Sequence, residues 1–227
     1  MKISVVLTFK DEQRAIDIYK IVQGWINAGA DEIILCDCCP TPKHPHYYYK
    51  SEDKSKVFYV RFEHDFGNVC RSCLSLLTSG YYIIFADDDV LPRKKLIEDM
   101  IGWKESIGAD FVGLIGRKLD NPNYLNSSFF AANKISNPVE VAFVGVCVLT
   151  ERRFLDYNLR PLINHSNLND IYWQCGEFPN ASKWVIPTLE YENLPTCMSN
   201  TALCHDKNTL KERFKAWEEY YEANHKG

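Results

Sequence analysis

The chain has 227 residues, a length that suits one domain and is ample for a sizeable core. Its 26 basic and 30 acidic residues give a formal net charge of −4 without a long basic run, which disfavours binding to nucleic acid. Because no apolar stretch approaches the roughly 20 residues that span a bilayer and no signal-peptide pattern opens the chain, we expect a cytoplasmic protein without a transmembrane segment, whose nine cysteines are thiols.

The first forty residues predict a strand, a helix and a second strand. Residues 3–9 are apolar and rich in β-branched side chains, as buried strands are. Residues 15–26 carry apolar side chains at helical spacing up to Gly29, and residues 32–36 form another short apolar run. This order predicts a βαβ unit in a parallel sheet.

The next segments continue the alternation. Residues 40–55 predict a loop and residues 57–62 a third strand. A helix begins at Gly67 and Asn68 and ends before Gly80. The continuous apolar run that follows, up to Ala86, predicts a strand that is buried in a mostly parallel sheet.

This run ends abruptly in three consecutive carboxylates, Asp87, Asp88 and Asp89. Adjacent side chains of like charge repel one another, and a hard divalent cation with oxygen ligands would offset that repulsion. In open α/β sheets the ligand crevice lies outside the carboxyl ends of the strands, where these residues fall. The alternative is a polar turn whose aspartates cap a helix that begins near Pro92.

Shorter elements are predicted in the second half of the chain. Gly145 falls inside a long apolar strand, and a glycine there often marks close approach by a ligand or another backbone. Asn169 or Asp170 is placed to cap a short helix. The predicted elements are a helix over 92–103, a strand over 111–115, a loop over 120–138, a strand over 139–149, a short helix over 152–155, a strand over 184–187 and an amphipathic helix over 207–221.

Two groups of cysteines raise the question of a zinc site. Cys36, Cys38 and Cys39 form one group, and Cys70 and Cys73 form the other. Structural zinc sites usually show cleaner paired spacing, and the second group falls on a predicted helix. The spacing therefore favours buried or half-buried thiols over a zinc site.

The order of these motifs resembles glycosyltransferases of the GT-A fold, closest in pattern to the inverting group called family 2. It is also similar to compact virus-encoded capsid glycosyltransferases. Asn169 departs from the family pattern, which has a carboxylate there. Four stretches between Ile3 and about His205 carry the resemblance: residues 4–10, residues 67–72, the Asp-x-Asp segment 85–89, and the segment from Gly145 through 152–154 to 169–170.

The resemblance implies a single α/β domain over 1–227, with a mostly parallel central sheet flanked by helices and a C-terminal helix. Within it, 1–110 would be a nucleotide-binding half, 111–205 an acceptor-binding half and 206–227 the C-terminal helix. The implied activity is metal-dependent, inverting transfer of a sugar, of the hexosyltransferase type. The donor would be a UDP- or GDP-linked sugar, and the acceptor a hydroxyl of a glycan or glycoprotein.

The resemblance also assigns roles to the carboxylates. With Mn²⁺ or Mg²⁺ as the cofactor, Asp89 would be a direct metal ligand, and Asp87 would contact the ribose or the metal. Asp88 stays open between metal and sugar. His205 would add a metal ligand or be a surface or capping histidine, since imidazole is softer than Mg²⁺ prefers. Asp170 would be the general base, with a helix cap as the alternative.

The remaining site residues follow from the same resemblance. Thr8 and Lys10 at the end of the first strand, and Asp37 at the end of the second, would bind the nucleotide. Arg71 would contact a phosphate or the base, or else form a surface salt bridge. On the acceptor side, Gly145 would mark the close approach, and Trp173 would form a wall or belong to the core.

Two other function classes stay open. A nucleotidyltransferase would also combine a βαβ fold, carboxylates and Mg²⁺, but it usually carries a glycine-rich basic loop after the first strand, and residues 10–14 contain no glycine. The chain also lacks the dinucleotide fingerprint and the P-loop. A non-catalytic protein that binds nucleotide sugars is the third reading, against which Asp87, Asp89 and Asp170 argue indirectly.

Overall fold

A computed structural model describes the chain except for residues 42, 44, 65–67, 156–171, 196–206 and 226–227. Its centre is an eight-stranded sheet with the strand order β3-β2-β1-β4-β11-β6-β12-β9. Four of its seven strand pairings are parallel: β3 with β2, β2 with β1, β1 with β4, and β6 with β12. The predicted α/β architecture with a mostly parallel sheet is confirmed.

The N-terminal half is built from β1 (Ile3–Phe9), β2 (Glu32–Asp37), β3 (Val57–Arg61) and β4 (Tyr82–Ala86). The predicted strands over these segments are confirmed. The apolar side chains of β1 and β2 are almost completely buried, as strands covered on both faces require.

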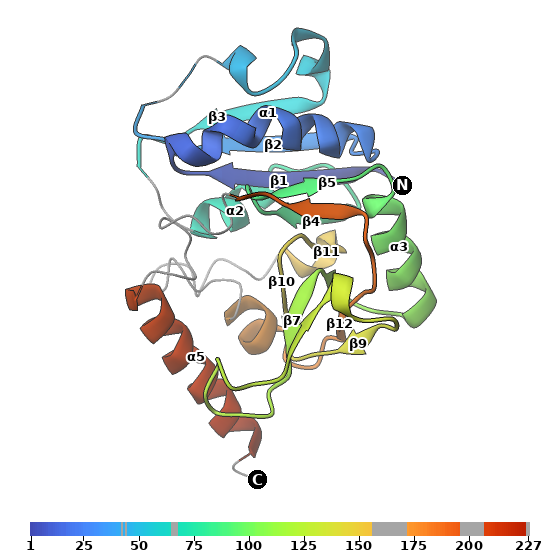
Figure 1. The fold of residues 1–227 in the computed structure, drawn as a ribbon, viewed down its shortest axis with the longest axis vertical. Helices are drawn as coiled ribbons and strands as arrows, with labels where there is room; N and C mark the ends of the chain where they lie inside the picture. The colour runs from blue at the N-terminus through green and yellow to red at the C-terminus, as the bar shows by residue number, and fades with distance from the viewer. Residues whose placement is uncertain (42, 44, 65–67, 156–171, 196–206, 226–227) are drawn as a thin grey trace.

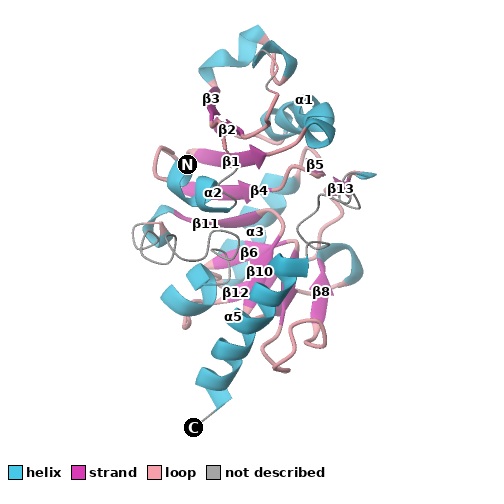
Figure 2. Cartoon of the chain, turned by 90° about the vertical axis from the view of Figure 1, so that its left-hand side faces the viewer, coloured by secondary structure: helices cyan, strands magenta, loops and turns pink. Residues whose placement is uncertain are grey.

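Helix α1 (Glu12–Asn27) connects β1 to β2, and α2 (Asn68–Ser75) connects β3 to β4. Because the two connections run in opposite directions along the sheet, right-handed crossovers place the helices on opposite faces (Figures 1 and 2). Asp11 caps α1, since its carboxylate accepts a hydrogen bond of 2.8 Å from the Arg14 amide. Gly29 follows the helix with φ of 104°, as predicted for its end.

The second half joins the first along β4. Strand β11 (Val148–Glu151) runs antiparallel to β4 and to β6 (Phe111–Gly113), and β12 (Lys183–Val185) and β9 (Val139–Glu140) complete the sheet. A separate three-stranded sheet contains β10 (Phe143–Gly145), β7 (Ile115–Arg117) and β8 (Phe129–Ala131).

Four predictions about the chain after β4 are wrong. The expected strand over 111–115 is divided between β6 and β7, which lie in different sheets, and the expected loop over 120–138 contains β8. The expected strand over 139–149 is divided into β9, β10 and β11, because Val146 and Cys147 have φ of 56° and 53° and bend the chain from the small sheet into the large one. The helix expected from Pro92 begins at Leu96 instead. Pro92 ends β5 (Val90–Pro92), which pairs with β13 (Tyr191–Asn193), and α3 follows as Leu96–Ile107.

The C-terminal helix α5 (Lys207–His225) lies at the end of the molecule away from β1–β4 (Figures 1 and 2). Trp217 anchors it, because its indole is fully buried and donates a 3.0 Å hydrogen bond to the Asn121 carbonyl. The Trp217 ring packs edge-on against Tyr124 in a small second core that also contains Ala216. Within the described residues, no helix combines the length and the apolar character needed to cross a bilayer.

Candidate active site

Polar side chains gather at one edge of the N-terminal half. The carboxyl ends of parallel strands meet at the same edge of a sheet, and here β1, β2 and β4 are neighbours. Thr8 is the next-to-last residue of β1, and Lys10 follows the strand; both are half-buried. Asp37 is the last residue of β2. Asp87 follows β4 directly. The structure therefore brings the predicted nucleotide-binding residues to one edge.

Arg14 is held against two of the three consecutive aspartates. One of its terminal nitrogens, Nη1, lies 2.8 Å from Asp88 Oδ1 and 2.7 Å from Asp89 Oδ2. The Arg14 side chain is only 7% exposed, and the two carboxylates are 17% and 18% exposed. In the part of the chain described here, a guanidinium thus offsets the repulsion that the sequence predicted a cation would offset.

Arg71 makes the corresponding contact with the third carboxylate. Its Nη1 lies 2.8 Å from Asp87 Oδ1, and both side chains are about one-fifth exposed, at 21% and 23%. Since Arg14 comes from α1 and Arg71 from α2, the triplet receives one arginine from each face of the sheet. The sequence left a surface salt bridge open as the alternative role of Arg71. The structure shows the salt bridge with Asp87, but both side chains are largely buried.

Burial dominates the electrostatics of the triplet. Loss of solvation raises the pKa of Asp88 to about 7, with Arg14 opposing the rise and the neighbouring Asp89 and Asp87 adding to it. Burial and the charge of Asp87 likewise raise the pKa of Asp89, although Arg14 lowers it in part. An additional positive charge at this edge would therefore favour the ionised carboxylates.

The donor atoms of the triplet suit a hard divalent cation that also has ligands from a substrate. Mg²⁺ is usually bound by one or two carboxylates together with substrate phosphates. Among the residues that the structure describes, the three aspartates do not bring three ligand oxygens within 4.8 Å of one another. The triplet thus fits as a source of one or two carboxylate ligands and does not form a complete protein cage.

Asp37 is completely buried, and both of its carboxylate oxygens accept hydrogen bonds. The Cys39 amide donates to Oδ1 and the Tyr59 hydroxyl to Oδ2, each at 2.8 Å. The Tyr59 ring stacks on Tyr48, with ring centroids 6.0 Å apart. These contacts hold Asp37 at the carboxyl end of β2, in a fixed position beneath the segment predicted as a loop.

Val146 and Cys147 form a strained bend beside the triplet. A β-branched residue with a positive φ is a backbone outlier, and such residues cluster at functional sites. Cys147 directly precedes β11, whose Val148 pairs with Phe85 of β4, so the bend lies beside the strand end that leads to Asp87. Burial and the charge of Asp87 raise the pKa of the Cys147 thiol. No sequence signal predicted this bend, since neither residue is a glycine.

The structure gives different positions to the acceptor residues predicted from sequence. Trp173 is 3% exposed and donates a 3.0 Å hydrogen bond to the Phe154 carbonyl, so it lies in the core, the alternative that the sequence left open. Gly145 lies in the small sheet, where an added Cβ would meet nothing closer than 3.4 Å. Asp170 and His205 lie outside the described residues.

Arg14 is the site residue that the sequence reasoning missed. The signal was present, because Arg14 shares the buried stripe of α1 with Ile18, Ile21 and Trp25 at helical spacing. A cation on the apolar face of a helix needs a buried partner. Such a residue in the first turn after β1 points to the edge where the strands end.

Comparison with known proteins finds no matching family model and no matching curated protein. Three solved structures of Staphylococcus aureus TarS share the fold. One matches with a TM-score of 0.63 at 14% identity over 87% of this chain and 37% of that chain. TarS 1–349 in complex with UDP matches with a TM-score of 0.62 at 15% identity, over 84% of this chain and 59% of that chain. TarS 1–349 in complex with UDP-GlcNAc matches with a TM-score of 0.64 at 13% identity, over 98% of this chain and 70% of that chain.

The present chain thus spans 37% of the first TarS chain. At these identities the likeness concerns the fold, and the GT-A-like fold that the sequence predicted is confirmed. The assignment of nucleotide and acceptor halves stays a prediction, as does the narrower similarity to capsid glycosyltransferases.

Proposed function

We propose that the chain is a nucleotide-sugar glycosyltransferase that moves a sugar from a UDP- or GDP-linked donor to a hydroxyl of a glycan or glycoprotein. The observation that carries the proposal is the aspartate triplet at the carboxyl end of β4, held by Arg14 and Arg71 from opposite faces of the sheet. Its support is the fold shared with TarS, which was crystallised with UDP and with UDP-GlcNAc.

The reaction breaks the bond between the anomeric carbon and the diphosphate and forms a bond from that carbon to the acceptor oxygen. Asp89 and Asp87 would hold Mn²⁺ or Mg²⁺, with His205 as a further ligand. When bound, the cation supplies Lewis-acid stabilisation of the charge that develops on the diphosphate. Arg71 binds a phosphate through its planar guanidinium, which suits bidentate contacts. Thr8 and Lys10 would position the nucleoside, whereas Asp37, which is buried and bonded to Tyr59, would act indirectly by fixing the end of β2.

Asp170 accepts the proton of the acceptor hydroxyl as the oxygen attacks. Attack from the face opposite the diphosphate, with a single base, inverts the anomeric configuration. Replacing Asp170 by Asn should leave donor affinity unchanged and lower transfer by about 100-fold, the scale of general-base contributions. Transfer at the unaltered rate would remove Asp170 from this role.

The decisive experiment is a thermal-shift and turnover panel of UDP-, GDP- and other nucleotide sugars with Mn²⁺, Mg²⁺ or chelator. We expect one nucleotide class to raise the melting temperature in the presence of a divalent cation and to be consumed slowly by hydrolysis. Asp89→Ala should abolish the cation-dependent shift, whereas Asp120→Ala, which alters an exposed carboxylate of the other half, should not. Failure of every nucleotide sugar to bind would refute the proposal.

The same panel separates the other function classes. A nucleotidyltransferase would join a sugar phosphate to a nucleoside triphosphate and release pyrophosphate. A binding protein would show the thermal shift without hydrolysis or transfer. The absence of glycine from residues 10–14 is the sequence feature that favours the glycosyltransferase over the first of these.

A further inference from the structure

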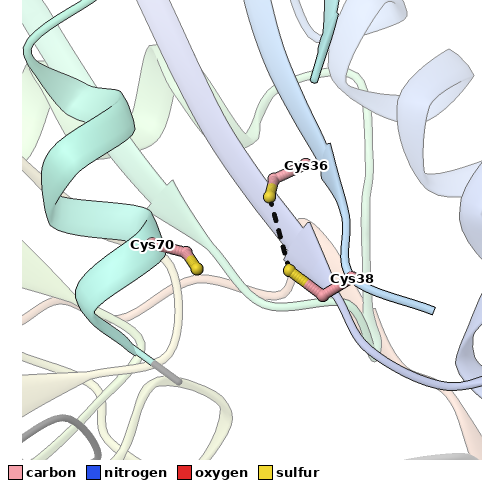
Figure 3. A group of neighbouring side chains, drawn as sticks. All are labelled: Cys36, Cys38 and Cys70. Atoms are coloured by element: carbon pink, nitrogen blue, oxygen red, sulfur yellow. Dashed lines mark hydrogen bonds between the residues drawn. The ribbon is translucent and has the colours of Figure 1, made fainter. Parts of the chain in front are cut away.

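Three buried cysteines meet behind the candidate active site. Cys36 lies in β2, Cys38 follows the strand, and Cys70 lies in α2. Their exposed fractions are 0%, 5% and 3%, and their sulfur atoms all lie within 4.8 Å of one another. Figure 3 shows the three side chains pointing toward one another.

The local backbone explains this convergence. Side chains two residues apart on an extended chain point to the same face, so Cys36 and Cys38 both face α2. Helix α2 packs against β1 and β2 and brings Cys70 to that face. Asp37, between the two cysteines, points the other way and bonds to Tyr59. The Asp37 carboxylate is thus not part of the group of three sulfur atoms.

The sulfur separation fits a shared metal ion. Zn–S bonds of about 2.3 Å at a tetrahedral angle place two sulfur atoms about 3.8 Å apart, and Cys36 Sγ lies 3.6 Å from Cys38 Sγ. A disulfide would need about 2.05 Å. Within the described part of the chain, no other His, Cys, Asp or Glu side chains form such a group of three.

A nucleophilic role does not fit this cluster. Hydrogen bonding with Cys38 and with Cys70, followed by burial, raises the pKa of the Cys36 thiol far above its usual range. Reactive cysteines need a low pKa and access to solvent. A soft metal ion also binds thiolates, but it displaces the thiol protons itself, and its site does not need access to solvent.

We propose that Cys36, Cys38 and Cys70 bind one thiophilic cation, Zn²⁺ or Cu⁺, as three thiolates. On binding, the three S–H groups release their protons to solvent and three sulfur–metal bonds form, with no change of oxidation state. Zn²⁺ would take a fourth ligand, whereas Cu⁺ is satisfied by thiolates alone. This soft site differs in chemistry from the hard-cation site proposed at the triplet.

Such an ion would join β2 to α2. Asp37 lies between two of the ligands, and Arg71 follows the third. The cation would therefore fix the relative positions of the strand that carries Asp37 and the helix that carries Arg71. The metal site does not rest on the proposed glycosyltransferase activity, and it is tested without any nucleotide.

The first test measures metal in the unaltered protein. After purification with a reducing agent, elemental analysis should find close to one equivalent of zinc or copper per chain. The reduced, metal-free protein should bind Co²⁺ with intense sulfur-to-cobalt absorption, or Cu⁺ in competition with a chromophoric chelator. Uptake of neither Zn²⁺, Co²⁺ nor Cu⁺ by the reduced protein would overturn the proposal.

The second test uses matched variants. Cys70→Ala and Cys36→Ala should each weaken metal binding by about 100-fold or more, beyond the loss from an outer-shell change. Cys39→Ala removes a buried cysteine one residue from Cys38 and should bind metal as the unaltered protein does. Equal binding by Cys70→Ala and Cys39→Ala, with folding checked by circular dichroism, would contradict the site.

A third measurement does not depend on any variant. Metal loading should slow hydrogen exchange in α2, since the ion ties this helix to β2. An adventitious surface ion would leave exchange in α2 unchanged. A disulfide between Cys36 and Cys38 in anaerobically purified protein, seen as a loss of two thiols, would also refute the assignment.

Discussion

Arg14 shows how one side chain can serve both stability and the chemistry of a site. It lies on the buried face of α1, yet its guanidinium reaches two aspartates at the end of β4. In the part of the chain that the structure describes, the guanidinium of Arg14 supplies the positive charge that holds Asp88 and Asp89. A bound divalent cation would add to it or take its place.

Arg14→Met should lower the free energy of unfolding by about 3 kcal/mol, because it leaves Asp88 and Asp89 buried without their counter-ion. Lys20→Met is the matched control on the same helix. Lys20 is 66% exposed and pairs with Asp17, so its loss should cost at most about 0.5 kcal/mol. Urea unfolding measures both, and equal losses would contradict the role of Arg14. Mn²⁺ should restore part of the stability of Arg14→Met.

Glu151 provides a pH-dependent contribution to stability. Burial raises the pKa of its carboxyl, but Lys104 at 2.6 Å, with Tyr81 and Arg153, lowers that pKa more, so the net shift is downward. A folded-state pKa below the unfolded value stabilises the protein above about pH 4.5. That stabilisation is lost as the pH falls through the folded-state pKa.

We therefore expect Glu151→Gln to be less stable than the unaltered protein by about 3 kcal/mol at neutral pH, since Lys104 stays buried without its partner. The difference in stability should narrow as the pH falls below about 4.5 and through the folded-state pKa, where Glu151 of the folded protein becomes protonated. Unfolding by urea between acidic and neutral pH measures this. Glu98→Gln, an exposed change on α3, is the control, and a pH-independent difference would contradict the assignment.

At the scale of elements, two helical glycines have opposite surroundings. A Cβ on Gly24 of α1 would lie 2.9 Å from the Pro92 carbonyl oxygen, because the helix packs closely on β5. A Cβ on Gly102 of α3 would meet nothing within 4 Å. Gly24 is therefore required for close packing, whereas Gly102 only weakens its helix.

Gly102→Ala should raise the free energy of unfolding by up to about 1 kcal/mol through helix propensity. Gly24→Ala gains the same propensity but forces α1 away from a backbone atom, and should lower stability by about 1–3 kcal/mol. Thermal and urea unfolding of the two variants compare them directly. A stabilised Gly24→Ala protein would show that α1 does not pack on β5 as the structure places it.

The sequence predicted the first half of the fold well because each element there has a strong local signal. The apolar runs of β1, β2 and β4 are buried on both faces, and α1 shows a clear helical period. The second half was harder to predict. The bend at Val146 and Cys147 depends on tertiary contacts, and the pairing of Pro92 with Tyr191 joins segments far apart in the chain.

The candidate site was predictable where residues fall at strand ends and not where helices contribute. Asp37 and Asp87 follow apolar strands, so their common edge can be inferred from parallel pairing. The contacts of Arg14 and the convergence of Cys70 with Cys36 depend on how α1 and α2 pack. Spacing along the chain, which disfavoured a metal site at the cysteines, does not contain that information.

At the scale of the whole molecule, the apolar core has two parts. The main core surrounds the large sheet and includes Trp25, which lies on the buried face of α1. The second core is small and holds α5 to the end of the molecule through Trp217. The two tryptophans are both fully buried, which makes them a matched pair for testing how independent these parts are.

Trp217→Ala should speed hydrogen exchange in α5 and around Asn121 and Tyr124 while leaving β1–β4 protected, because its contacts lie in the second core. Trp25→Ala should instead destabilise the main sheet by about 3–5 kcal/mol. Hydrogen exchange with mass spectrometry resolves the two patterns. If Trp217→Ala reduced the protection of β1–β4 as much as that of α5, the molecule would unfold as one cooperative unit.

The strand order also affects how the chain folds as it is synthesised. β1 to β4 are consecutive in the sequence and adjacent in the sheet, but the other neighbour of β4 begins only at Val148. A nascent chain that has emerged as far as α3 therefore carries β4 with one edge unpaired. Such an apolar edge favours aggregation and recognition by chaperones until β11 covers it. A fragment limited to residues 1–110 would keep that liability permanently.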